Sequence, residues 1–306
     1  MKIRKILIAS IFFLFILGFL FNFNNSNKYN DLKKQADDLK IDTTMYNPGF
    51  IVSNNEIDTL TAEINTFIQK QKDEEELKKA IANNQNGVPI LMYHFFTPSG
   101  QTPPDGNWIN IDTFESHLQM FKDNNVNPIT VEQYNGWFQE TGVIPENSVL
   151  ITIDDGQPGT YELAAPMLEK YGYTAVSFEI TSKWDNYDVK KQNKNLELHS
   201  HTNDMHKGSC AGNSKSGMMQ CVDVEEGIED LKTSKSIINP DDYFFCYPFG
   251  GYEGVAKDVL RGAGYKYAVT VDHGVSKKDM DPLELPRIRV SSATTAETLK
   301  EFVLDN

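Results

Sequence analysis

The sequence has little positive charge for its length. Its 306 residues include 29 basic and 43 acidic side chains, which gives a formal charge of −14 at pH 7. Because a nucleic-acid interface needs a basic footprint to bind phosphates, this balance excludes DNA and RNA as partners. It also disfavours docking flat on an anionic lipid surface. No internal repeat is evident, so a repeat architecture is not expected.

Cysteine is equally scarce, with only Cys210, Cys221 and Cys246. The first two flank a stretch rich in Gly, Ser and Asn, which is typical of a loop. In an oxidising compartment, a disulfide between Cys210 and Cys221 would close that loop covalently. Cys246 lies in an apolar, strand-like run and is expected to be a small buried hydrophobe. The alternative is three free thiols.

Long hydrophobic runs are absent, with one exception between residues 6 and 23. Such a run nearly spans a hydrocarbon core of about 30 Å, and the basic residues Lys2, Arg4 and Lys5 should stay in the cytoplasm. We therefore expect residues 1–23 to be a single-pass anchor in the cell membrane, with the rest of the chain extracytoplasmic. The alternative is a cleaved signal peptide and a secreted protein, although no small-x-small site follows the run.

Residues 24–87 are interpreted as a linker and a helical stalk. Residues 24–53 are rich in Asn, Asp and Lys without a sustained period. From Ile57 onward, apolar residues recur at steps of three and four, which is typical of an amphipathic helix. A solvated spacer is the expected role, with a partner-binding helix as the alternative. The remaining residues, 88–306, are expected to form the functional domain.

This region alternates short apolar runs with helical patterns. The expected strands are 89–93, 148–154, 174–180, 196–202, 243–249 and 265–271, and the expected helices are 111–124, 160–171, 224–238 and 252–263. Alternation of this kind predicts parallel strands joined by helices, and therefore an α/β domain. With six or more units, a barrel is favoured over an open sheet.

Two adjacent carboxylates, Asp154 and Asp155, end one of the expected strands. Burying both charges would be unfavourable without a cation or hydrogen bonds. Gly156 would let the chain turn, so that both side chains reach one cleft. One carboxylate could then bind a metal, while the other, with its proton affinity raised by the like charge, serves as a base. A solvated turn is the alternative.

Histidine is concentrated at another expected strand end, where His199, His201 and His206 fall within eight residues. Imidazole is a preferred zinc ligand, and two His with one carboxylate leave positions open for water and substrate. His199 shares a strand face with His201 and could also approach the cleft. The cluster therefore predicts a metal site, because strand ends of parallel sheets and barrels gather at one edge.

These segments resemble the motifs of the polysaccharide deacetylases of the NodB-homology type. Residues 152–156 (TIDDG) are similar to the motif T-F-D-D-G, and His201-Thr202 matches the start of H-[ST]-x-x-H. His206 comes five residues after His201 rather than four, a spacing similar to that of poly-N-acetylglucosamine deacetylases and related Gram-positive wall enzymes. Residues 247–250 (YPFG) resemble the end of R-x-P-[YF]-[GA], and residues 91–95 (LMYHF) resemble an M-Y-H segment. The resemblance covers residues 88–292.

The resemblance implies a distorted (β/α) barrel that removes acetyl groups from N-acetylated sugars of a surface polysaccharide. Asp155, His201 and His206 would bind a divalent metal, zinc in the first place, with cobalt, manganese or nickel as alternatives. Asp154 would be the general base, and the backbone amide of Phe249 would donate to the oxyanion. We expect a monomer whose partners are peptidoglycan or poly-N-acetylglucosamine and, through the N-terminal helix, the membrane.

Two supporting residues of the family are missing from their usual places. No late His motif is visible, so His94 is the expected general acid and His273 the alternative. Cys246 occupies the position of the arginine that usually orients the base. Arg287 or Arg289 could supply that charge from elsewhere, or both could be surface cations.

The residues expected to contact substrate are Trp108, Tyr247, Pro248, Phe249, Tyr252 and Arg287. Ordinary packing is the alternative for Trp108 and Tyr252. Two other functions remain open beside the N-deacetylase. One is a catalytically silent member that binds glycan, and the other is a different hydrolase on the same scaffold, such as a carbohydrate O-deacetylase or a phosphatase.

Overall fold

The computed structural model describes residues 87–304 apart from 184, 209 and 211–216, together with some residues between 62 and 77. The chain divides into two compact units, Met1–Ala80 and Ile81–Asn306. In the first unit the described residues are helical, and the Gln69 side chain donates to Asp73 one turn later. The expected anchor at residues 1–23 lies outside the described residues. Within the described part of the chain, no helix has the length and apolar character needed to cross a bilayer.

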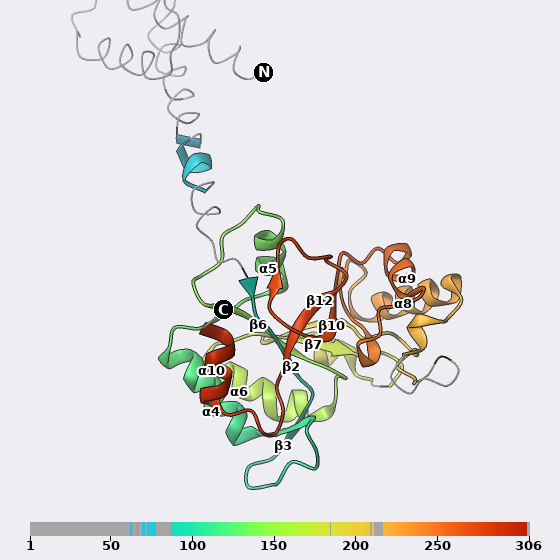
Figure 1. Ribbon diagram of the computed structural model, residues 1–306, viewed down its shortest axis with the longest axis horizontal. Helices are drawn as coiled ribbons and strands as arrows, with labels where there is room; N and C mark the ends of the chain where they lie inside the picture. Colours follow the sequence, from blue (N-terminus) through green and yellow to red (C-terminus); the bar gives the residue numbers. More distant parts are fainter. Residues whose placement is uncertain are drawn as a thin grey trace, which may run out of the picture. The chain divides into compact units, whose positions relative to one another are not determined.

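The second unit is built on a seven-stranded parallel barrel (Figure 1). Its strands are, in spatial order, β2 (Ile90–Tyr93), β12 (Leu285–Arg289), β10 (Tyr267–His273), β9 (Phe244–Cys246), β8 (Leu196–Ser200), β7 (Ala175–Glu179) and β6 (Ser148–Ile153). The pairing of β2 with β6, from Ile90 opposite Leu150 to Tyr93 opposite Ile153, closes the ring. The (β/α) barrel expected from the sequence is therefore present.

Short strands flank the barrel. The first residues of β6 also pair with β5 (Asn127–Pro128). Antiparallel β1 (Gly87–Val88) and β11 (Ser276–Lys277) form one small sheet, and parallel β3 (Phe95–Thr97) and β4 (Trp108–Asn110) form another.

Helices surround the strands. They are α4 (Ile111–Asp123), α5 (Val131–Phe138), the π-helix η1 (Thr160–Ala164), α6 (Ala165–Tyr171), α7 (Tyr187–Lys190), the 3-10 turn η2 (Met218–Gln220), α8 (Val224–Ile238), the 3-10 turn η3 (Pro248–Gly250), α9 (Ala256–Gly262) and α10 (Ala296–Leu304). Helices α4, α6 and α10 lie together on one side, and α8 and α9 pack together on another (Figure 1).

The helices begin where the sequence supplies capping side chains. The Asn110 side chain accepts from the amide of Asp112 at the start of α4, and Asp223 does the same for Glu225 and Glu226 at the start of α8. Helix α5 begins with a capping box between Thr130 and Gln133. Such caps satisfy amides that have no partner within the helix.

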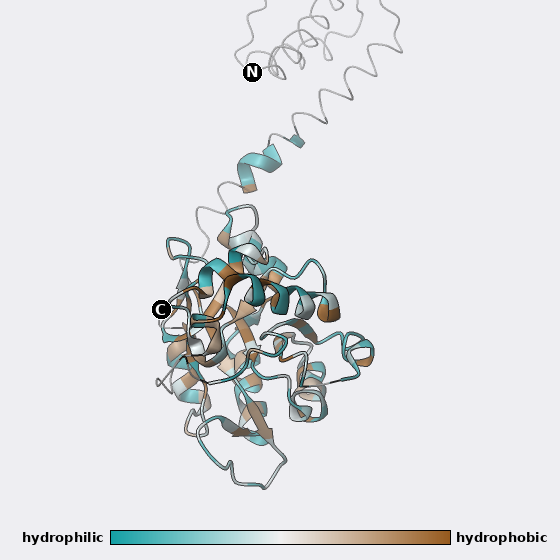
Figure 2. Ribbon diagram, turned by 90° about the vertical axis from the view of Figure 1, so that its right-hand side faces the viewer, coloured by the Kyte–Doolittle hydropathy of each residue, from teal (hydrophilic) through white to brown (hydrophobic). Residues whose placement is uncertain are grey.

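The strands are buried on both faces, as expected for a barrel wrapped by helices. Every residue of β6 is buried. Leu150 packs with residues of β2, β7, β9, β10 and β12 inside the barrel, whereas Ile151 and Ile153 pack outward beneath the helices. In Figure 2, hydrophobic colours are concentrated in the strands, and the loops are mostly hydrophilic. Because side chains alternate along a strand, Asp154 continues the interior row.

Candidate active site

Three strand ends carry polar side chains at the same edge of the barrel. Asp154 and Asp155 follow β6, His201 follows β8, and η3 follows β9. Since all seven strands are parallel, their carboxyl ends meet at one opening, which is where barrel enzymes place their chemistry.

Asp155, His201 and His206 converge at this opening. Asp155 Oδ1 lies 3.6 Å from His201 Nε2 and 3.1 Å from His206 Nε2. The three ligand atoms lie within 4.8 Å of one another, close enough to share one cation. Asp155 and His201 are buried, and His206 is partly exposed on the solvent side. The three residues expected to bind a metal are thus brought together.

The backbone leaves its usual conformation to direct these side chains. Asp155 and Thr202 both have φ of 75°, in the left-handed region that non-glycine residues seldom adopt. Gly156 follows with φ of 59°, and a Cβ at this position would lie 2.2 Å from Glu179 Oε2. The turn therefore begins at Asp155, one residue before the glycine expected to start it. Backbone conformations of this kind are concentrated at functional sites.

A buried hydrogen bond fixes the tautomer of His201. Its Nδ1 lies 2.7 Å from the carbonyl oxygen of Cys246, which can only accept, so Nδ1 carries the proton. The lone pair of Nε2 is then directed toward Asp155. Burial lowers the pKa of His201 to about 4, so the ring is neutral at pH 7, as a metal ligand must be.

The charge on Asp155 completes a donor set that fits a divalent cation. Burial by itself would raise the pKa of Asp155, but the hydrogen bond from His206 and the electrostatic interactions with His201 and His206 outweigh it and lower the pKa. A second group, Asp154, His201 and Cys246, is equally close. It fits a cation less well, because burial raises the pKa of the Cys246 thiol and keeps it protonated.

Arg287 holds Asp154 from β12, which is separated from β6 in the barrel only by β2. Its Nη1 lies 2.7 Å from Oδ1 and its Nη2 2.8 Å from Oδ2, a bidentate pair. The same guanidinium donates to Thr152 Oγ1 at 3.1 Å and to the Thr270 carbonyl at 2.7 Å, and Nη2 lies 3.3 Å from Cys246 Sγ. Arg287 therefore supplies the charge that Cys246 cannot.

This pairing contradicts two expectations. Burial favours the protonated form of Asp154, but Arg287 and His94 outweigh it and hold the pKa well below its usual range, so its proton affinity is not raised. The like charge of Asp155 is the weaker influence because Arg287 is closer. Arg287 itself is only 1% exposed, so it is not available to a molecule in the opening, contrary to the expectation that it contacts substrate.

His94 and His273 lie in different surroundings. His94 Nε2 is 3.7 Å from Asp154 Oδ2, and its buried Nδ1 has no hydrogen-bond partner among the described residues. Burial lowers the pKa of His94, although Asp154 and Asp155 oppose this. His273 lies at the exposed end of β10 with its ring 5.7 Å from that of Phe302 in α10, on the outer side of the barrel. His94 is therefore the histidine beside the carboxylates.

The turn η3 brings Phe249 over the histidines. Phe249 has φ of 59°, its side chain is 45% exposed, and its ring lies 4.6 Å from that of His206. Tyr247 differs from its expected role, because its ring is buried and its hydroxyl donates to the Leu283 carbonyl at 3.0 Å. Pro248 is buried as well. Both support the turn and leave Phe249 to face the opening.

The other aromatic candidates and His199 pack against protein. Trp108 is partly buried with its ring 5.0 Å from that of Phe95. Tyr252 is partly buried and hydrogen-bonds Asp272. His199 does not approach the opening, because its Nδ1 lies 2.6 Å from Asp242 Oδ1.

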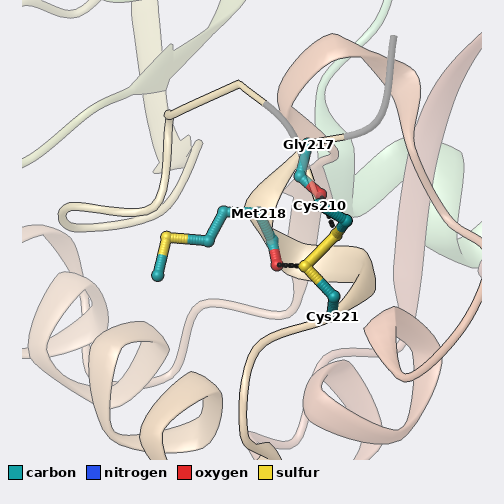
Figure 3. Close-up of a disulfide and its surroundings, with 4 residues drawn as sticks. All are labelled: Cys210, Gly217, Met218 and Cys221. Atoms are coloured by element: carbon teal, nitrogen blue, oxygen red, sulfur yellow. Dashed lines mark hydrogen bonds between the residues drawn. A yellow bond between two sulfur atoms is a disulfide. The ribbon is translucent and has the colours of Figure 1, made fainter. Parts of the chain in front are cut away.

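Cys210 and Cys221 are joined in the structure, with an S–S distance of 2.00 Å (Figure 3). Cys246 is a free, buried thiol. Gly217, which precedes Cys221 in the described part of this segment, lies against η3, since a Cβ at this position would be 2.7 Å from the Pro248 carbonyl oxygen. Sequence reasoning missed Asp230, Ser234 and Asp242, whose roles depend on partners distant in the sequence.

The sequence is similar to known proteins. Residues 142–268 match the family described as polysaccharide deacetylase. A Staphylococcus aureus protein named poly-beta-1,6-N-acetyl-D-glucosamine N-deacetylase is 27% identical over 206 residues, which cover 62% of this chain and 70% of that protein.

Solved structures share the fold. The deacetylase PplD of Streptococcus pyogenes, solved with acetate, aligns with a TM-score of 0.62 and 22% identity over 71% of this chain and 98% of that chain. IcaB from Ammonifex degensii aligns with a TM-score of 0.60 and 19% identity over 72% of this chain and 98% of that chain.

Proposed function

Because the chain belongs to the polysaccharide deacetylase family, we propose that it hydrolyses acetamido groups on N-acetylated sugars of a cell-surface polysaccharide, with a divalent metal as cofactor. The observation that carries the proposal is the convergence of Asp155, His201 and His206 beside an Asp154 held by Arg287. Peptidoglycan and poly-N-acetylglucosamine are the proposed substrates, and the S. aureus relative favours the second.

Asp154 is the proposed general base. Its pairing with Arg287 keeps it ionised at neutral pH and fixes its orientation toward the opening. A carboxylate with so low a pKa accepts protons weakly, so the attacking water must be made more acidic by another group.

Asp155, His201 and His206 would hold the cation that meets this need. When bound there, a divalent metal would polarise the acetamide carbonyl and lower the pKa of water. Zinc is the proposed ion, with cobalt, manganese and nickel as alternatives, because imidazole and carboxylate ligands suit all four. The Cys246 carbonyl keeps His201 in the tautomer required for binding.

His94 and Phe249 complete the proposed chemistry. The backbone amide of Phe249, in the turn beside His206, would donate a hydrogen bond to the developing oxyanion. His94, next to Asp154, would take up the proton that Asp154 receives from the attacking water and pass it to the leaving amine. The exposed Phe249 ring offers an apolar surface for the sugar or its acetyl group.

A catalytically silent, glycan-binding role has less support. Its motivation is the cysteine at the position of the family arginine, and Arg287 compensates for that loss. An O-deacetylase would use the same groups, because its leaving alkoxide also takes up a proton, and the name of the S. aureus relative favours the N-deacetylase.

We also propose that the enzyme works outside the cytoplasm as a monomer. The apolar run at residues 6–23 would anchor it in the cell membrane, or would be removed to give a secreted protein. A Cys210–Cys221 disulfide is consistent with an oxidising compartment.

The test is release of free amines from chitooligosaccharides, poly-N-acetylglucosamine and purified wall. Activity should vanish after chelation and return with added zinc or cobalt. His206→Ala should abolish metal occupancy, and the matched His273→Ala should leave it unchanged. Full occupancy of the His206→Ala protein would refute the ligand assignment, and acetate release without free amines would point to an esterase.

A further inference from the structure

The turn between His201 and His206 is held by side chains from outside it. Three consecutive amides, those of Thr202, Asn203 and Asp204, donate to side-chain oxygens. Thr202 N–H donates to Ser200 Oγ at 3.1 Å. Asn203 N–H donates to Asp230 Oδ1 and Asp204 N–H to Asp230 Oδ2, both at 2.8 Å. One carboxylate thus accepts from two neighbouring amides of the turn.

Asp230 belongs to α8, which contacts the turn at a second point. Ser234 lies one helical turn after Asp230 and therefore on the same face. Its Oγ lies 2.7 Å from Ser200 Oγ, the group that accepts from Thr202. The face of α8 formed by Asp230 and Ser234 accordingly contacts the chain at both ends of the strained Thr202, whose φ is 75°.

The end of β7 fixes the other side of the turn. Thr181 N–H donates to the Thr202 carbonyl and Ser182 N–H to the Asn203 carbonyl, both at 3.1 Å. The turn therefore lies between two supports. The support after β7 combines these backbone groups with the hydroxyls of Thr181 and Ser182, which donate to the side chains of Asn203 and Asp204, whereas the α8 support depends on the identity of Asp230.

The two histidines depend on this turn unequally. His201 follows β8 directly, is 2% exposed and is fixed by the Cys246 carbonyl. His206 lies at the far end of the turn with its side chain 21% exposed. Its distance from Asp155 therefore depends on the conformation of residues 202–205.

We propose that Asp230 is a positioning residue for the metal site, which sets the location of His206 relative to Asp155 and His201 and so the affinity for a divalent cation. The inference rests on the metal-dependent function proposed above. Hydrogen bonds that orient metal ligands commonly change affinity 10- to 100-fold when they are removed. The ionised carboxylate makes these bonds stronger than neutral ones.

The test compares Asp230→Asn with Glu229→Gln in the full chain. Asp230→Asn keeps the side-chain volume but replaces one acceptor with a donor that opposes an amide N–H. Glu229 is exposed on the same helix, so Glu229→Gln removes the same charge without touching the turn. Zinc affinity is measured by competition with a chromophoric chelator, and the ligand field is measured from the visible spectrum of the cobalt-loaded protein.

We expect Asp230→Asn to bind zinc about 10-fold or more weakly, with an altered cobalt spectrum and activity regained at high metal concentration. Glu229→Gln should match the wild type. Unchanged affinity and spectrum in Asp230→Asn would overturn the proposal. If that variant does not fold, Ser234→Ala is measured instead, with weaker binding expected and unchanged binding contradicting the role of α8. A wild type that binds no metal would instead refute the proposed function.

Discussion

Arg287 and Asp154 form a buried bidentate pair inside the barrel, although 133 residues separate them in sequence. Arg287 lies in the last strand, β12, and the cysteine at the family's arginine position contacts the guanidinium. The charge that orients Asp154, the proposed base, thus comes from β12 and not from the end of β9. The catalytic competence of the site should depend on this residue.

Replacing Arg287 with Met should disable the enzyme and destabilise the fold. Removal of one partner of a buried ion pair typically costs about 3–5 kcal/mol, because the remaining charge has no compensation. Amine release should fall by a factor of about 100 or more, because Asp154 loses its orientation. Urea unfolding and steady-state kinetics measure the two effects. Arg287→Lys keeps the charge and should be less destabilised than Arg287→Met. Equal activity of Arg287→Met and the wild type would contradict the assignment of Arg287 as the residue that orients Asp154.

The same substitution should reverse the effect of acid on stability. In the wild type the pKa of Asp154 is depressed, so the pair stabilises the fold above the ordinary carboxyl pKa of about 4 and is lost as the pH falls below it. In Arg287→Met, burial raises that pKa, so protonation on acidification should relieve part of the destabilisation. Unfolding curves between pH 7 and 4 test the sign.

His94 rather than His273 should protonate the leaving amine. His94→Asn is expected to lower kcat by a factor of about 100 or more with little change in KM, because a general acid acts in the transition state. His273→Asn should retain activity within a factor of about two, since His273 packs against α10 outside the barrel. A large loss in His273→Asn alone would reverse the assignment.

The parts of the fold that were predictable are those specified by local pattern. The six expected strands are all present, because runs such as residues 148–153 (SVLITI) are mostly apolar and β-branched. Strand β12 was missed, since its sequence, LPRIR, contains a proline and two arginines and does not resemble a buried strand. It is buried because Arg287 finds its counterion inside the barrel. Helices α5, α7 and α10 were also not predicted.

For the site as well, the sequence predicted the features that depend on local spacing and missed those that depend on distant residues. The proximity of Asp155, His201 and His206 follows from their places at parallel strand ends, which sequence spacing reveals. The pKa of Asp154 was predicted in the wrong direction, because the sequence shows the neighbouring Asp155 and not the distant Arg287. Tyr247 was wrongly expected to contact substrate, since only the fold directs its hydroxyl to Leu283.

The pair formed by His199 and Asp242 should make stability depend on alkaline pH. Burial alone would lower the pKa of His199, but Asp242 outweighs it and raises the pKa to about 9. Because the pKa is raised, the pair stabilises the fold fully at pH values below about 6.5, which is the pKa of histidine in the unfolded chain. This contribution is lost as the pH rises through about 9. The full contribution is on the order of 3 kcal/mol.

Unfolding free energies measured from pH 6 to 10 test this expectation. His199→Gln should be less stable at pH 6 and should show a flatter profile than the wild type. A wild-type stability that stays constant over that range would contradict the pairing. Amine release by His199→Gln should persist while the protein is folded, because His199 faces away from the opening.

The three cysteines should differ in reactivity. Cys210 and Cys221 are joined, whereas Cys246 is a free thiol in the barrel interior. Alkylation of the native, unreduced protein should therefore add no label, and alkylation in denaturant should add one, because unfolding exposes Cys246 alone. Reduction before denaturation should raise the number to three, as measured by intact mass. Three labels in denaturant without reduction would show that no disulfide joins Cys210 and Cys221.

The double variant Cys210→Ser, Cys221→Ser should lower the free energy of unfolding by about 2–3 kcal/mol, since the unfolded chain regains the entropy of an open loop. Because that loop packs against η3, the double variant should also raise KM for polysaccharide before it affects metal binding.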